Sequence, residues 1–334
     1  MMPKSVVRAF TAALVGLGVL WSASLATAQT RWDLPVPWAA TEFHTLNLNK
    51  FVERVKAATD GQVLITVHPG GSLGIRGPEA LRALRNGVVP ILEMSLFQQA
   101  GDEAMFGFDS LPFIADNYEQ LFLLQNVVYR DYEAALAKHK AKPLYRVPFP
   151  SLYFFTKKPA SSLADLKGIK MRSFDRGSTD LVRRLGMNPV QLVIGDVVPA
   201  LASGALDGTI TSAGTAASQK YWEFLKYAYL TNHAWTTNWL AVNIDAWNKL
   251  SPAHREAIEK IAGEMQMDNW ASAVEEGAKG AAELRKNGMI VEAANPNMIK
   301  EMRVAAEPMW DEFVKSVGGS IPEALAKYRK LTGK

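Results

Sequence analysis

The 334-residue chain contains no cysteine. This absence excludes a disulfide-stapled scaffold, a zinc ribbon, an iron–sulfur site and a cysteine nucleophile. An excess of one charge is missing too: 37 basic residues oppose 33 acidic ones, and a net charge of +4 is too small to indicate nucleic-acid binding. The chain is 48% hydrophobic and 21% charged, which is the balance of a globular protein with a large buried core.

The common catalytic and cofactor motifs are missing or incomplete. There is no H-E-x-x-H, no phosphate-binding P-loop and no G-x-G-x-x-G. Residues 70–74 (GGSLG) match G-x-S-x-G, but a nucleophile elbow needs a helix directly after the serine, and the next helix is expected only from Gly77-Pro78. The five histidines show no metal-ligand spacing. We therefore expect no catalytic residues, no metal site and no cofactor.

Long hydrophobic runs are confined to the N-terminus. Lys4 and Arg8 precede an apolar run over 12–21, which is too short to span a bilayer comfortably, and small residues follow up to Ala28. This pattern predicts a Sec signal peptide over residues 1–28, cleaved before Gln29, with an uncleaved anchor as the alternative. The mature protein is thus expected to be exported, which means the periplasm in a Gram-negative cell.

Strand and helix patterns alternate along the remaining chain. Apolar residues recur at helical spacing over 42–59 and 117–140, while β-branched residues dominate 63–68 and a further strand is expected over 169–173. Alternation of this kind indicates an α/β fold with parallel units, and the length suggests two domains.

One expected helix is unusually long. Ser251 and Pro252 form a strong helix start, and good helix formers continue up to Asn287-Gly288. A helix over the 36 residues 252–287 measures about 54 Å, longer than one domain is wide. The alternative is a pair of shorter helices broken near Gly277–Gly280.

Arg172 lies at the end of an expected parallel strand, on the same face as Lys170 and Phe174. Ligands of open α/β sheets bind at the carboxyl ends of strands. An arginine there offers a planar fork of donors that matches a carboxylate, although an isolated arginine is more often part of a surface ion pair.

Six short segments match, in order, motifs that recur in one protein family. They are HPGGSLG (68–74), DSLPF (109–113), DLKGIKMR (165–172), LGMNPV (185–190), AL…LDG (200–208) and TNH (231–233). The set resembles the substrate-binding proteins of tripartite ATP-independent periplasmic (TRAP) transporters, of the DctP-like family.

The resemblance implies a two-lobed periplasmic binding protein with a long domain-spanning helix. Lobe I is expected over 29–150 plus about 239–277, and lobe II over 151–238 plus about 278–334. Such proteins close on a ligand by hinge motion and deliver it to a small and a large integral membrane subunit, driven by an ion gradient. We expect a monomer with no enzymatic activity and no nucleic-acid partner.

The resemblance also assigns binding residues. Arg172 corresponds to the family's carboxylate-binding arginine. Elsewhere the chain departs from the family: Tyr153 or Leu152 takes the place of a frequent second arginine, Thr211 (followed by Ser212) replaces an asparagine, and Ile194 replaces a phenylalanine. These departures argue against sialic acid and simple dicarboxylates, since a second carboxylate would want a second fixed cation.

The rest of the expected cleft is aromatic. The residues concerned stand near the ends of strands or near the crossings between lobes: Trp38, Phe43, Phe174 and Trp235, with Glu93 and Ser95 at the end of the third strand. Together with a single cation they favour an aromatic or apolar monocarboxylate. An ABC-type solute-binding protein and an exported α/β enzyme acting on a carboxylate are the alternatives.

Overall fold

The computed structural model describes residues 29–334. The expected signal peptide over 1–28 lies outside these residues. Within 29–334, no helix is both long enough and apolar enough to cross a membrane.

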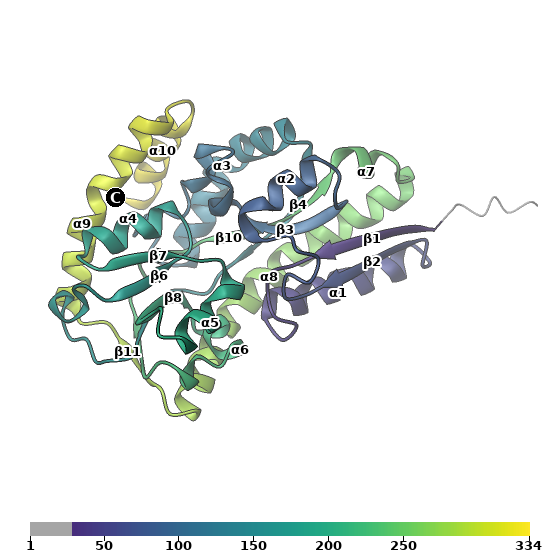
Figure 1. Ribbon diagram of the computed structural model, residues 1–334. Helices are drawn as coiled ribbons and strands as arrows, with labels where there is room; N and C mark the ends of the chain where they lie inside the picture. Colours follow the sequence, from purple (N-terminus) through teal and green to yellow (C-terminus); the bar gives the residue numbers. More distant parts are fainter. Residues whose placement is uncertain (1–28) are drawn as a thin grey trace, which may run out of the picture.

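The strands of the described chain form three sheets (Figure 1). The largest has the order β11-β9-β5-β8-β6-β7, the second β3-β10-β4, and β1 pairs in parallel with β2. Their bounds are β1 Thr30–Pro35, β2 Val63–His68, β3 Ile91–Ser95, β4 Ala141–Pro148, β5 Leu152–Thr156, β6 Lys170–Ser173, β7 Asn188–Gln191, β8 Gly208–Ser212, β9 Tyr227–Leu230, β10 Thr237–Asn243 and β11 Ile290–Ala293.

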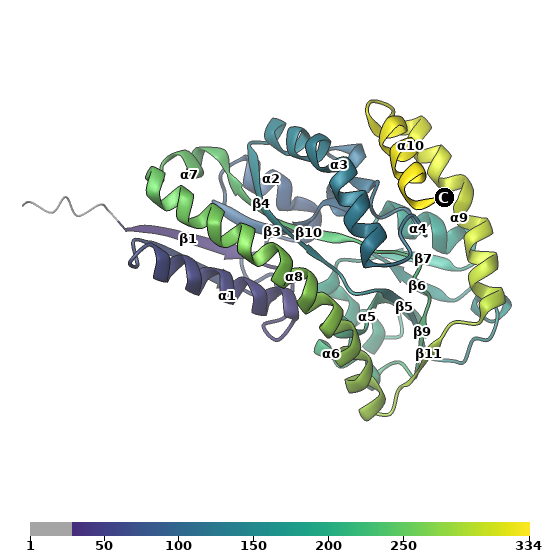
Figure 2. The same ribbon diagram turned by 180° about the vertical axis from the view of Figure 1, so that it is seen from behind.

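Helices cover these sheets (Figures 1 and 2). Their bounds are α1 Phe43–Ala58, α2 Ala80–Arg85, α3 Tyr118–Lys138, α4 Arg176–Arg184, α5 Val197–Ala202, α6 Ala213–Ser218, α7 Ile244–Asn248, α8 Pro252–Lys286, α9 Pro296–Val317 and α10 Ile321–Thr332. The predicted two-lobed α/β class is confirmed.

The sheets are not purely parallel, whereas the alternation of strands and helices in the sequence predicted parallel units. β6 runs parallel to β7 and β8, but β5 is antiparallel to β8 and β9. Likewise β10 is antiparallel to β3 and β4. The antiparallel strands β5 and β10 are the two that begin directly after the chain passes from one sheet to the other.

Two short connections between the larger sheets, neither of which contains a helix, lie side by side. One joins β4 to β5 and the other joins β9 to β10. Phe149 N donates to Thr236 O at 2.8 Å, and Asn232 N donates to Leu152 O at 3.3 Å. Backbone hydrogen bonds thus tie the crossings together, which suits them to act as a hinge.

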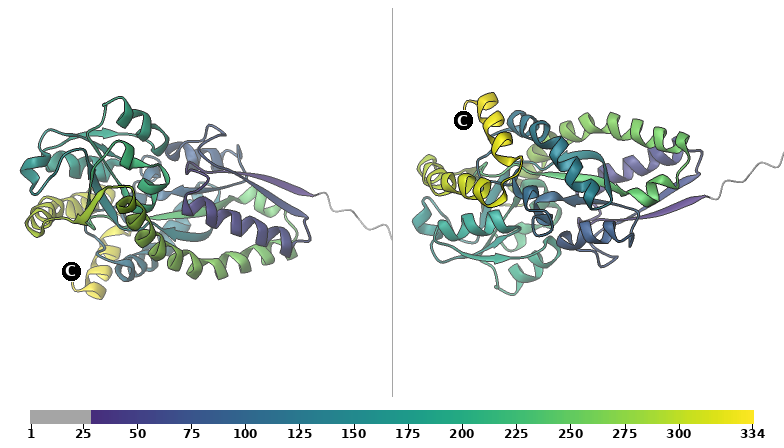
Figure 3. Two further views of the ribbon diagram at one scale, coloured as in Figure 1. Left: turned by 90° about the horizontal axis from the view of Figure 1, so that it is seen from below. Right: turned by 90° about the horizontal axis from the view of Figure 1, so that it is seen from above.

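The predicted long helix is present and unbroken as α8. Ser251 caps its start, with its hydroxyl accepting from His254 N at 3.1 Å. The helix packs on α1 and β4 along its first part and on α6 and β11 along its last part. Figures 2 and 3 show it running along both halves of the molecule. The alternative of two helices broken near Gly277–Gly280 is wrong.

The C-terminal helices return from one half to the other. α9 buries Met298, Met302 and Met309 in the core of the six-stranded sheet, whereas α10 buries Leu325 and Tyr328 against α3. The division expected from the sequence placed all of residues 278–334 in lobe II. We propose that the lobe boundary falls within the last part of α9, because Phe313 and Val314 already pack against the core that α10 enters.

Candidate functional site

Arg172 sits on β6 with its side chain almost fully buried, at 3% exposure. Its Nε donates to Leu192 O at 3.0 Å and its Nη1 donates to Ile210 O at 3.0 Å, so the fork is held in one orientation by backbone carbonyls. The guanidinium carbon lies 5.6 Å from the centre of the Phe174 ring. Burial lowers the pKa of Arg172 to about 10, with Tyr221 and Asp175 opposing the shift, and the group remains a cation at neutral pH.

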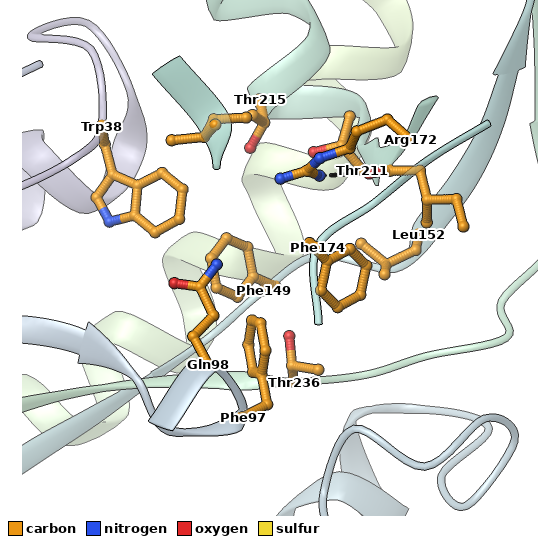
Figure 4. A pocket seen from close by; sticks show the side chains of 12 residues that line it. Trp38, Phe97, Gln98, Phe149, Leu152, Arg172, Phe174, Thr211, Thr215 and Thr236 are labelled. Atoms are coloured by element: carbon orange, nitrogen blue, oxygen red, sulfur yellow. Dashed lines mark hydrogen bonds between the residues drawn. The ribbon is translucent and has the colours of Figure 1, made fainter. Parts of the chain in front are cut away.

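A cavity of about 40 Å³ opens in front of this guanidinium (Figure 4). Residues from both halves of the molecule and from the two crossings line it, so the site exists only where the halves meet. The lining residues are Trp38, Phe97, Gln98, Phe149, Leu152, Arg172, Phe174, Ile194, Ile210, Thr211, Thr215 and Thr236.

Aromatic rings form much of the cavity wall. Phe97, which follows β3, packs edge-on against Phe174 from β6 with ring centres 5.3 Å apart. Trp38 packs edge-on against Phe149 at 5.4 Å. Threonine hydroxyls and the Gln98 amide supply the neutral polar groups. Arg172 is the single charged side chain among the lining residues of the described chain.

Five of the predicted site residues line this cavity: Trp38, Arg172, Phe174, Ile194 and Thr211. The structure therefore brings together Trp38 after β1, Arg172 and Phe174 at the end of β6, Ile194 of a short 3₁₀ helix and Thr211 of β8.

The other predicted residues lie nearby without lining the cavity. Ser212 accepts from Thr215 N at 3.2 Å and so begins α6. Tyr153 is replaced at the cavity by its neighbour Leu152, because successive strand residues face opposite sides. Trp235 packs on Tyr118 with ring centres 4.8 Å apart. Phe43 contacts His44 at 4.1 Å between ring centres.

Glu93 and Ser95 belong to a buried polar cluster behind the cavity wall. Glu93 Oε1 lies 2.9 Å from His44 Nδ1 and accepts from Asn238 Nδ2 at 2.8 Å. Ser95 Oγ donates to Asn238 Oδ1 at 2.5 Å. His44 in turn stacks on Trp38 at 5.5 Å between ring centres. The cluster therefore supports a lining residue from behind.

Glu42 links this cluster to the second half of the molecule. Its Oε1 accepts from the hydroxyl of Thr215, a cavity residue on α6, at 3.3 Å. Burial raises the pKa of Glu42 to about 7, while His44 pulls the pKa downward.

Sequence reasoning missed Phe97, Gln98, Phe149, Ile210, Thr215 and Thr236. Phe149 and Thr236 belong to the crossings, and a signal for Phe149 existed in the short gap between two apolar strands at 144–156. Across residues 29–334, no cluster of three or more histidines and acidic residues could hold a metal ion.

Two α/β halves joined by a hinge, with one buried cation facing an aromatic cavity between them, define a binding protein for a small acid. The family model of the bacterial extracellular solute-binding proteins, family 7 (DctP), matches residues 37–316. The chain belongs to this family, whose members are TRAP solute-binding proteins that serve transport rather than catalysis.

Solved structures and curated relatives agree with this assignment. A marine metagenome TRAP solute-binding protein, specific for pyroglutamate, is 35% identical with a TM-score of 0.86, and the match covers 90% of this chain and 99% of that one. DctP7 of Bordetella pertussis, which binds pyroglutamic acid, is 27% identical with a TM-score of 0.87 at the same coverage. The C4-dicarboxylate-binding periplasmic protein DctP of Rhodobacter capsulatus is 28% identical over 85% of each chain.

TRAP solute-binding proteins bind small organic acids and work with membrane components. The chain is therefore a solute-binding protein for an organic acid.

Proposed function

We propose that this protein is a periplasmic receptor for a small acid with one carboxylate and a ring-shaped or apolar body, and that pyroglutamate is the leading candidate. The observation that carries the proposal is the composition of the cavity wall. One buried arginine supplies the only charge among the lining residues of the described chain, and Trp38, Phe97, Phe149 and Phe174 surround it.

The wall offers the groups that such an acid needs. The Arg172 fork is pre-oriented by two backbone carbonyls, so it loses little freedom on binding a carboxylate. The hydroxyls of Thr211, Thr215 and Thr236 can hydrogen-bond a ring amide, and the aromatic rings can pack on the faces of a small ring. Pyroglutamate combines one carboxylate, one amide and a five-membered ring.

The relatives support the same choice. The marine metagenome protein at 35% identity and the Bordetella pertussis protein at 27% both bind pyroglutamate. The dicarboxylate receptor of Rhodobacter capsulatus shares the family, but the cavity here lacks a second cation that a second carboxylate would want.

Delivery to the membrane follows from the family. The closed form, in which both halves contact the ligand, is the form that a small and a large integral membrane subunit would recognise, with an ion gradient driving uptake. We propose export by the N-terminal signal peptide and a monomeric receptor.

Isothermal titration calorimetry tests the ligand. We expect the mature protein to bind pyroglutamate, or an aromatic monocarboxylate, at least about tenfold tighter than succinate. The uncharged analogue 2-pyrrolidone, which has the ring amide without the carboxylate, is the matched control and should not bind measurably. Tighter binding of succinate than of every monocarboxylate would contradict the proposal.

A further inference from the structure

A second, larger cavity adjoins the ligand cavity on its outer side. It encloses about 180 Å³ and shares Trp38, Gln98 and Ile194 with the inner cavity. A ligand that is longer than the inner cavity would extend past these three side chains into the outer one.

An ion pair between the two halves of the molecule lines this outer cavity. Arg76, from the loop after β2, donates through Nη1 to Asp196 Oδ2 at 3.0 Å and through Nη2 to Asp196 Oδ1 at 3.3 Å. Asp196 ends a short 3₁₀ helix, Ile194–Asp196, that begins with a residue of the inner cavity wall. The paired bonds are those that Arg76 would otherwise form with a carboxylate of a ligand.

Charge at the two cavities is therefore divided unequally. Arg172 in the inner cavity has no carboxylate among its hydrogen-bond acceptors, whereas Arg76 in the outer cavity donates through both Nη1 and Nη2 to Asp196. A second carboxylate reaching the outer cavity would meet a neutralised arginine and the negative charge of Asp196. Both partners are partly exposed, with 58% of Arg76 and 40% of Asp196 accessible, so the pair adds little to folding stability.

We propose that Asp196 is a specificity-determining residue that restricts the site to acids with one carboxylate, by occupying the Arg76 fork and repelling a second negative charge. The inference deepens the proposed function and depends on it for the monocarboxylate anchored at Arg172. Specificity of this kind arises because a residue repels the wrong ligand, here one with a second carboxylate, rather than because the right ligand gains better contacts.

The test compares dissociation constants of wild type and Asp196→Asn for pyroglutamate and for a chain-length series of dicarboxylates from succinate to pimelate. Asparagine keeps the shape and removes the charge. We expect at least one dicarboxylate to bind about tenfold or more tightly in D196N relative to pyroglutamate. The ratio of the two constants is the readout, because any effect on lobe closure applies to both ligands.

Two controls isolate the cause. Asp180 on α4 is also 40% exposed and pairs with Arg183, but it lines neither cavity, so D180N should keep the wild-type ratio. The double variant R76Q/D196N should lose the gained dicarboxylate binding. An unchanged ratio in D196N, or a gain that persists in the double variant, would overturn the proposal. A wild-type preference for dicarboxylates would contradict the proposed function instead, while the change in dicarboxylate affinity between variants would still report on Asp196.

Discussion

At the scale of the residue, binding depends on how Arg172 is held. Its fork faces the cavity while two of its donors are fixed by the carbonyls of Leu192 and Ile210. A buried cation without a carboxylate partner is costly unless a ligand supplies one. This arrangement explains why a single side chain can anchor an acid in an otherwise neutral, aromatic site.

Replacing Arg172 by alanine should therefore weaken binding of the cognate acid by more than about 2 kcal/mol, because the ligand carboxylate loses its charged partner in a buried site. Calorimetry measures the loss. Arg172→Lys should retain part of the affinity, since lysine keeps the charge but not the fork. Near-normal affinity in the alanine variant would show that the acid is anchored elsewhere.

Glu42 should make stability depend on pH. Its pKa rises to about 7 in the folded protein, so its contribution to stability is fully present below the unfolded pKa near 4.5 and is lost as the pH rises through 7. The groups facing it are His44, Glu93 and Glu276, together with the Thr215 hydroxyl.

Glu42→Gln should remove this loss, because glutamine keeps an oxygen acceptor for Thr215 without a charge. We expect the variant to be more stable than wild type above pH 7 by on the order of 1–3 kcal/mol, with the difference shrinking toward pH 5. Urea unfolding at a series of pH values measures the difference, and parallel curves for the two proteins would refute the assignment.

The sequence allowed Arg172 and part of the wall to be predicted, but not all of it. Strand geometry placed Arg172 near the carboxyl end of a strand, and the family resemblance implied its role as the carboxylate-binding residue. Phe97 and Phe149 follow strands in short irregular segments, where periodicity gives no direction for a side chain. The family resemblance left Tyr153 and Leu152 as alternatives on β5, and Leu152 is the one that lines the cavity, because successive strand residues face opposite sides.

At the scale of the element, α8 packs on both halves of the molecule. The helix crosses α6 at a point where its backbone approaches directly: a Cβ at Gly280 would lie 2.4 Å from the backbone nitrogen of Gly214. Only glycine allows this close crossing, and the crossing positions Thr215 of α6 at the cavity.

Gly280→Ala should accordingly destabilise the protein by about 1–3 kcal/mol, because the added methyl group meets backbone rather than a movable side chain. Gly263 lies on the same helix with nothing within 4 Å of a built Cβ, so Gly263→Ala should stabilise by up to about 1 kcal/mol. Thermal or urea unfolding compares the two variants. Equal changes in the free energy of unfolding for the two variants would mean that α8 and α6 can move apart to accept the added methyl group.

Local signals predicted α8 well, since a serine cap, an N-terminal proline and a terminal Asn-Gly mark both ends. They did not predict that β5 and β10 run antiparallel. The direction of those strands follows from the two chain crossings, and crossings depend on which apolar faces meet in three dimensions rather than on local pattern.

At the scale of the whole molecule, the structure is closed around the cavity. Contacts join the halves at Arg76 with Asp196, at Phe97 with Phe174 and at Glu42 with Thr215. Arg172 is only 3% exposed, and we expect a ligand to reach it when the halves separate by hinge motion. Binding should therefore shift the population from an open to this closed form.

Small-angle X-ray scattering should show this shift as a smaller radius of gyration when the cognate acid saturates the protein. The change should vanish in Arg172→Ala at the same ligand concentration, because the ligand then no longer bridges the halves. Identical scattering with and without ligand in the wild type would contradict closure by hinge motion.

Ligand recognition in this protein should depend on a carboxylate of the solute meeting Arg172 in the gap between the two halves. The most direct measurement is calorimetry on wild type and Arg172→Gln with the tightest-binding acid and with its uncharged primary amide. We expect wild type to bind the acid at least about a hundredfold tighter than the amide, and the arginine variant to bind the two alike. Equal affinity of the wild type for acid and amide would contradict it.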